Sequence, residues 1–397
     1  MIRRHGLFLL SCLFAFTAGH MFNYTVILYL QESVGSDLLS GIGFGLAFGS
    51  SIVFGWYGGV LCDRLAPVRV IHGAQALFLL GLACIAWADQ GAAPEVRPAW
   101  VLLGAFFGGL AWSFVGPARL TALAKMVSAN ELRPATIVFN LQVLLGFGLA
   151  PLLLGIIRSR AGWAMVLGAA AAAFVLSSLL LLPLKTQAQL QSSSNSVRTD
   201  IAQGFAVVGA NQLLRQLMLA AVVAFAMTGP LQILLPKLAR TQLGLSESAR
   251  GAYLGLLAIS LILGGVAALV LSRWLHHGRA IFGGVSVGSA LFATLAAIEQ
   301  PVLSAFVLCA VGVLGGMVIS LVISGIQTQT PEHLRGRVMA MYSITSQVVP
   351  ALSGVVAGAV VSRVNIVGSI ALCGSVLCGV ALFAAWRLSA LRCHAAA

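Results

Sequence analysis

Long apolar runs dominate this chain and limit the folds that it can adopt. Twelve runs of about 20 apolar residues follow one another along its 397 residues, and short polar breaks separate them. A bilayer core about 30 Å thick requires about 20 apolar residues per helix, because every backbone N–H and C=O must be paired within its own segment. Only 8% of the residues are charged, against about 25% in a soluble domain. The sequence therefore predicts an all-α membrane protein with twelve transmembrane helices.

One long polar interruption divides these runs into two sets of six. The predicted N-terminal half covers residues 1–184, and the predicted C-terminal half covers 217–397. The segment between them, 185–216, begins with a Gln- and Ser-rich stretch typical of a flexible linker. In its second part, 200–216, apolar residues recur at helical spacing. That pattern fits a helix lying on the inner membrane surface, and it fits a soluble linker helix equally well.

The distribution of basic residues predicts the orientation. If consecutive loops alternate between the two sides of the membrane, 15 of the 23 Lys and Arg residues fall on one side. Cytosolic loops carry such an excess, so both termini and the central linker are predicted to be cytosolic, in a bacterial inner membrane. The apolar run after Arg3 and Arg4 continues to Leu30, which is too long for a cleaved signal peptide. The basic residues form no stripe, so no nucleic-acid partner is expected despite a net charge of +13.

A short charged break follows the second apolar run, with the pattern Gly59-x-x-x-Asp63-Arg64-x-x-x-x-Arg69. Together with twelve helices and a central linker, this break resembles the major facilitator superfamily, and the resemblance covers the whole chain. The loop departs from that superfamily's signature at Ala66, where a second glycine is usual.

The resemblance implies two six-helix halves that rock about a central site. It also implies a gate at the inner end, made by Asp63, Arg64, Arg69 and Arg337. In that gate Asp63 lies against the start of the helix that begins near Arg337, where the helix dipole favours an anion. Arg64 and Arg69 tie the inner ends of neighbouring helices.

Two further stretches narrow the likeness. Gly116-Pro117-Ala118-Arg119 and residues 327–342 look like the branch that contains the enterobactin exporter and macrolide-efflux proteins. This implies export of a siderophore or a similar small metabolite. Multidrug or macrolide efflux is the alternative, and a lysophospholipid transporter or a non-transporting receptor is more distant. Residues 146–155 are similar to an antiporter motif, although Ala150 precedes the proline and one extra residue precedes Gly155.

The sequence lacks the groups that an enzyme would need. It has no Ser/His/Asp or Cys/His set, no paired carboxylates in a helix core, and no phosphate-binding loop of an ATPase. The seven cysteines show no C-x-x-C spacing, so no metal site and no cofactor are expected. Active transport would draw on an ion gradient. The expected partners are a small-molecule substrate and the lipid bilayer, with an outer-membrane export system as an open option, and the chain is expected to be a monomer.

Ionisable groups inside a membrane helix are the first candidates for ion coupling, because keeping them there is costly. His20, Asn23 and Tyr24 share one face of the first predicted helix, 7–30, which by the resemblance lines the central site. A histidine in water titrates near neutral pH, so His20, and Glu32 at the outer end of this helix, are candidates for carrying a coupling proton. The alternative is a neutral histidine that is hydrogen-bonded to a neighbouring helix.

Six further polar residues in predicted helices are candidates to line the substrate site. They are Asn140, Gln142, Gln232, Gln327, Ser343 and Gln347. Each would serve equally well as an interhelical hydrogen-bonding group. Arg119, near the inner end of the fourth predicted helix, is a candidate gating residue. Its side chain can snorkel to the interface, pair with Asp63 or meet an anionic substrate, and a structural pairing is preferred to substrate contact.

Overall fold

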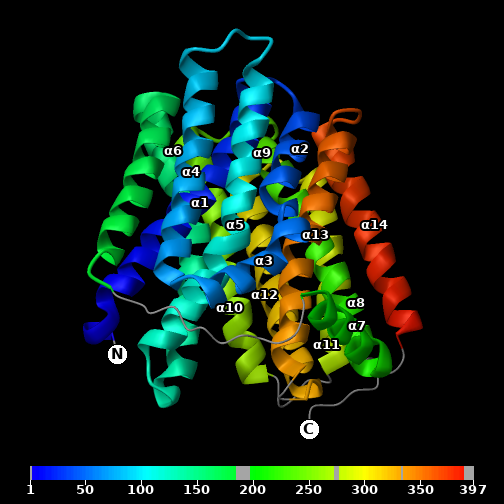
Figure 1. The fold of residues 1–397 in the computed structure, drawn as a ribbon. Helices are drawn as coiled ribbons and strands as arrows, with labels where there is room; N and C mark the ends of the chain where they lie inside the picture. Colours follow the sequence, from blue (N-terminus) through cyan, green and yellow to red (C-terminus); the bar gives the residue numbers. More distant parts are fainter. Residues whose placement is uncertain (1, 185–196, 272–276, 332–333, 389–397) are drawn as a thin grey trace. The chain divides into compact units, whose positions relative to one another are not determined.

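The computed structural model describes residues 2–184, 197–271, 277–331 and 334–388. These residues are nearly all helical and include no strand (Figure 1). Within this part of the chain, eleven helices are long and apolar enough to cross a membrane. One of them covers 48 residues, Pro134–Leu181, about twice the length of a single span. It is interrupted at Gly162, where φ is 69°. The predicted all-α fold is confirmed. The fifth and sixth predicted helices, about 136–157 and 162–184, are the two parts of this long element.

The first compact unit contains six helices and a short piece of a later one, Leu245–Gly255. The six helices are α1 (Ile2–Glu32), α2 (Asp37–Gly49), α3 (Ser51–Arg64), α4 (Pro67–Gln90), α5 (Arg97–Met126) and α6 (Ala129–Leu181). α1 packs mainly against α6, whereas α5 is contacted by α2, α3 and α4. α5 therefore lies against several helices of this unit.

The second predicted helix, 38–62, is divided into α2 and α3 at Ser50. The Ser50 hydroxyl donates a hydrogen bond to the carbonyl oxygen of Leu46 at 2.8 Å. The same carbonyl faces Gly109 of α5, where an added Cβ would collide with it. In lipid, small residues let helix backbones approach closely in this way. Gly109 thus allows the end of α2 to lie directly on α5.

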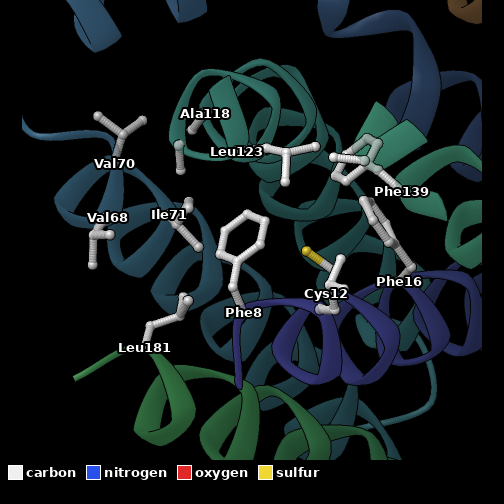
Figure 2. Close-up of a cluster of buried hydrophobic side chains, with 13 residues drawn as sticks. Phe8, Cys12, Phe16, Val68, Val70, Ile71, Ala118, Leu123, Phe139 and Leu181 are labelled. Carbon is white, nitrogen blue, oxygen red and sulfur yellow. The ribbon is translucent and has the colours of Figure 1, made fainter. Parts of the chain in front are cut away.

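A cluster of apolar side chains fills the unit where α1, α4, α5 and α6 meet (Figure 2). Phe8, Cys12 and Phe16 follow one another along one face of α1 at helical spacing, and Figure 2 shows Phe8 and Cys12 among side chains of the other three helices. Cys12 is a free thiol that is fully buried here, as expected for a small packing residue.

The second compact unit holds the remaining helices together with the rest of α10 (Glu247–Leu271) from Leu256 onwards. These helices are α7 (Val197–Ala210), α8 (Gln212–Ala226), α9 (Thr228–Thr241), α11 (His277–Thr294), η1 (Leu295–Ala297), α12 (Pro301–Gln329), α13 (Arg335–Val361) and α14 (Ile366–Arg387). α13 packs against α7, α8 and α9, while α11 packs against α12 and α14.

Two local sequence signals account for the breaks before and within the seventh predicted helix. Asn211 ends α7 and caps α8, since its side-chain oxygen accepts a hydrogen bond from the backbone N–H of Leu214 at 3.0 Å. The helix expected over 200–216 is therefore α7 followed by the first turn of α8. Met227 separates α8 from α9, and Pro230, which has no N–H to donate, lies in the first turn of α9. The first part of the linker, 185–196, lies outside the described residues.

Candidate functional site

The predicted polar face of α1 exists, and it faces two aromatic side chains. The His20 ring lies 5.1 Å from the Trp112 ring of α5 and 5.3 Å from the Phe147 ring of α6, measured between centroids. The Tyr24 ring lies 6.1 Å from that of Phe147. His20 and Tyr24 therefore point to the same neighbour, as residues at i and i+4 on a helix should.

Two polar atoms in this group have no hydrogen-bond partner among the described residues. They are Nε2 of His20 and Nδ2 of Asn23, and both are buried. The other polar atom of the Asn23 side chain, Oδ1, accepts a hydrogen bond from Nε1 of Trp112 at 3.2 Å. This bond holds the Asn23 amide beside the aromatic rings. A buried polar group without a partner costs about 1–3 kcal/mol. A polar group of a bound molecule that paired with these two atoms would remove this cost.

Arg119 of α5 is fully buried, so it does not snorkel to the interface, and that alternative is wrong. Its Nη1 donates to Oγ of Ser11 and to Sγ of Cys12, both at 3.2 Å, and its Nη2 donates to Oγ of Ser177 at 2.9 Å. Where side chains are described, no carboxylate forms an ion pair with it, and its Nε has no hydrogen-bond partner. Hydroxyl groups and a thiol therefore solvate this charge.

The polar group around Arg119 continues to α4. Gln75 donates from Nε2 to Oγ of Ser177 at 2.6 Å and accepts a hydrogen bond from Ser178. Oγ of Ser177 also donates to the backbone carbonyl of Ser11 at 2.8 Å. These bonds cross-link α1, α4, α5 and α6 inside one unit.

Glu32, the second candidate for proton coupling, is engaged by two arginines. Its carboxylate lies 2.5 Å from Nη1 of Arg158 in α6 and 2.6 Å from Nη1 of Arg250 in α10. Only 8% of the Glu32 side chain is exposed. Carrying a proton on this carboxylate would mean breaking these charge-assisted contacts.

The other predicted site residues in the first unit differ from one another. Asn140 is exposed, whereas Gln142 is half-buried and donates from Nε2 to the backbone carbonyl of Leu9 at 2.8 Å. The side-chain oxygen of Gln142 has no partner among the described residues. Gln142 therefore acts at least as a link between α6 and α1.

The predicted residues of the second unit lie on three helices. Gln232 of α9 is buried, Gln347 of α13 is half-buried, and Gln327 of α12 and Ser343 of α13 are exposed. Beside Ser343, the ring of Tyr342 packs against that of Phe225 of α8 at 5.6 Å. The role of these four polar residues in substrate binding stays a prediction.

The charged break after the second apolar run forms the end of α3 and the start of α4. Arg64 and Arg69 are exposed, and Arg337 at the start of α13 is half-buried. Ala66 has a φ of −59°, so its position in the turn does not need the glycine that the signature would place there. The side chain of Asp63 lies outside the described ones, so its gating role stays a prediction.

Sequence reasoning missed the aromatic and ionic partners of these residues. Trp112 and Phe147 lie inside apolar runs, where an aromatic residue is expected to be an ordinary packing residue. Arg158 and Arg250 lie near the ends of predicted helices, where a charged residue is expected to face solvent in a loop. No local pattern connects Arg250 with Glu32, which stands 218 positions earlier in the chain.

Comparisons with known proteins agree with this architecture. The sequence profile described as Major Facilitator Superfamily matches residues 8–354. The enterobactin exporter EntS of Salmonella choleraesuis (strain SC-B67) is 28% identical over 354 residues, which cover 87% of this chain and 82% of that protein. A POT family transporter in complex with 5-aminolevulinic acid shares the fold with a TM-score of 0.77 at 11% identity, covering 98% of this chain and 96% of that one. The xylose transporter XylE from E. coli has a TM-score of 0.71 at 13% identity, with 96% of each chain covered.

Proposed function

The chain belongs to the Major Facilitator Superfamily, and we propose that it exports a siderophore or a similar small polar metabolite by alternating access. The transporter class follows from the family, whereas substrate, direction and coupling are the proposal. The export direction is supported by the relative named as an enterobactin exporter, which matches most of this chain at 28% identity.

The substrate class is inferred from two buried polar atoms on α1 that have no partner among the described residues. Nε2 of His20 and Nδ2 of Asn23 are buried without partners, beside the rings of Trp112 and Phe147. A ligand that pairs with both atoms would recover the free energy that their burial costs. Its ring systems would pack against the aromatic side chains. None of these residues carries a fixed charge, so the site suits a ligand with many hydrogen-bonding groups and aromatic or apolar parts.

Multidrug efflux is the second candidate, because the same aromatic side chains would accept an apolar drug. A deletion strain grown under iron limitation separates the two functions. Loss of siderophore from the spent medium, with unchanged drug sensitivity, is expected. Normal siderophore in the medium together with increased drug sensitivity would move the function to efflux.

Coupling to a proton gradient is assigned to His20 in preference to Glu32. His20 has an unpartnered buried nitrogen, whereas the Glu32 carboxylate is bound by two guanidinium groups. The inner gate is assigned by family resemblance to Asp63, Arg64, Arg69 and Arg337. The same proposal places the protein in the inner membrane as a monomer. It also includes the use of an outer-membrane export system.

Uptake into inverted membrane vesicles tests the proposal directly. Vesicles that contain the protein should accumulate the siderophore when a proton gradient is imposed, and a protonophore should abolish accumulation. Vesicles from a strain without the protein are the control. Binding of the compound with no accumulation under any gradient would mean that the chain is a receptor rather than a transporter.

A further inference from the structure

One positive charge without a counter-charge lies in the same unit as the polar group on α1. Residues 5–31 of α1 and 134–157 of α6 contain no Asp, Glu, Lys or Arg, and residues 98–124 of α5 contain only Arg119. The Arg119 side chain is fully buried. Among the side chains that the structure describes, no carboxylate pairs with it. The surroundings of Arg119 therefore leave its full charge in the interior of the unit.

Two aromatic rings connect this charge with the polar group. The guanidinium carbon of Arg119 lies 5.9 Å from the centroid of the Phe16 ring, which is stacked at 6.4 Å on the ring of Trp112. The Trp112 ring in turn lies 5.1 Å from that of His20. Arg119 and Trp112 are seven residues apart on α5, which is two turns, or about 10 Å along the helix axis. Because salt ions do not enter a packed interior, they screen the charge little over this distance.

The free polar atoms beside Trp112 suit a ligand of the opposite charge. Nε1 of Trp112 can only donate a hydrogen bond, so it is Oδ1 of Asn23 that faces it and Nδ2 that has no partner among the described residues. The amide nitrogen Nδ2 is a donor, and only an acceptor satisfies it. Negatively charged oxygens are the strongest acceptors. The free donor and the charge of Arg119 therefore favour the same kind of ligand, one with an anionic oxygen.

We propose that Arg119 selects ligands by charge, so that a small aromatic anion, with a carboxylate or an ionised phenol, binds in preference to a cation of the same size. Arg119 acts through space, because its contacts reach Asn23 only through Phe16 and Trp112. A unit charge about 10 Å away changes the affinity for an ion about tenfold at an effective dielectric constant of about 20. The proposal rests on the function and the binding site proposed above, and it makes cationic drugs poor substrates.

Three probes that share one ring system and differ in charge test the proposal. Naphthylacetate is an anion, naphthylacetamide is neutral, and naphthylethylammonium is a cation. Equilibrium dialysis against the purified full-length protein in detergent, at neutral pH, gives the dissociation constant of each probe. The wild-type protein should bind the anion more tightly than the amide, and the amide more tightly than the cation.

Arg119→Met should weaken binding of the anion about tenfold, strengthen binding of the cation about tenfold and leave binding of the amide unchanged. Arg119→Lys keeps the charge and should keep the preference for the anion. A purely structural role would give the opposite order, because methionine fits a buried apolar position better than lysine does. Arg160→Met, at an exposed arginine of α6, is the matched control and should change none of the three constants. Raising the salt concentration from about 0.01 M to about 1 M should leave the preference in place, since salt screens surface charges and not a buried one.

Equal affinities of the wild-type protein for the three probes, or no binding of any of them, would overturn the proposal. A preference that survives in Arg119→Met would also overturn it, and so would an equal loss of affinity for all three probes in that variant. Uptake of naphthylacetate into inverted vesicles separates these results from failure of the proposed function. Uptake without a charge preference leaves transport intact and removes the selectivity, whereas a preference in binding without uptake under any gradient leaves the selectivity and removes transport.

Discussion

Among single residues, Arg119 is notable because burying its charge costs free energy of folding. A guanidinium stays charged in a protein, and here three neutral side chains, those of Ser11, Cys12 and Ser177, solvate it. Among the side chains that the structure describes, none of opposite charge pairs with it, and burying an unbalanced charge opposes folding. Ser11 and Ser177 also hydrogen-bond directly to each other, at 2.8 Å between their hydroxyl oxygens, so they keep a partner without the arginine. The fold alone therefore gives little reason for a charge at this position.

We accordingly predict that Arg119→Met leaves thermal stability in detergent unchanged or raises it, by up to about 4 kcal/mol. Arg119→Lys should lower stability, because an ammonium must still be desolvated but cannot reach the same three partners. Melting temperatures of the purified variants check this order. Arg160→Met, at an exposed arginine, is the control and should change stability by less than about 0.5 kcal/mol. The opposite order, with Met less stable than Lys, would show that the charge itself stabilises the fold.

His20→Gln tests coupling at the same scale. Glutamine keeps a hydrogen-bonding group but does not titrate near neutral pH, so gradient-driven accumulation should fall about tenfold or more. Exchange of substrate without a gradient should persist. His72→Gln, at a half-buried histidine of α4, is the matched control. Unchanged accumulation with an unchanged pH profile would make His20 a structural residue.

At the scale of elements, helix contacts in the first unit depend on positions where no side chain fits. An added Cβ at Gly108 would collide with the Phe22 ring, and one at Gly109 with the Leu46 carbonyl. Glycines recur along α5 at positions 104, 108 and 109, and small residues of this kind favour close helix packing in lipid. Which helices approach at these glycines was not predictable, since glycine spacing does not name a partner. The structure assigns α1 to Gly108 and α2 to Gly109.

Gly109→Ala should therefore destabilise the protein by about 1–3 kcal/mol, because α2 and α5 must move apart. Gly116→Ala, on the same helix, is the matched control, since an added Cβ there meets nothing within 4 Å. That control should be neutral or slightly stabilising, by up to about 1 kcal/mol, because alanine is the better helix former. Thermal unfolding in one detergent compares the two variants. Equal melting temperatures would argue against close packing at Gly109.

At the scale of the whole molecule, the distribution of basic residues predicts the orientation. Fifteen of the 23 Lys and Arg fall on the predicted cytosolic side, so both termini should face the cytosol. A fluorescent protein fused after Ala397 should fluoresce, and alkaline phosphatase fused at the same place should be inactive. Fusions after Glu95, in a loop predicted to be periplasmic, are the control and should give the opposite pair of results. Active phosphatase at the C-terminus would reverse the predicted orientation.

The properties that belong to a single segment could be predicted from the sequence. Length and apolarity predict that segments such as Asp37–Gly55 and Pro301–Gln329 are membrane helices. In lipid, a segment must pair its backbone N–H and C=O groups within itself. The face shared by His20 and Tyr24 also followed from helical spacing. The tertiary structure decided what depends on residues far apart in the chain. It places Ser11 and Ser177 around Arg119, and it pairs Glu32 with Arg158 and Arg250. These pairings depend on which helices become neighbours. Hydropathy does not encode that choice, because many arrangements of apolar helices have the same hydropathy.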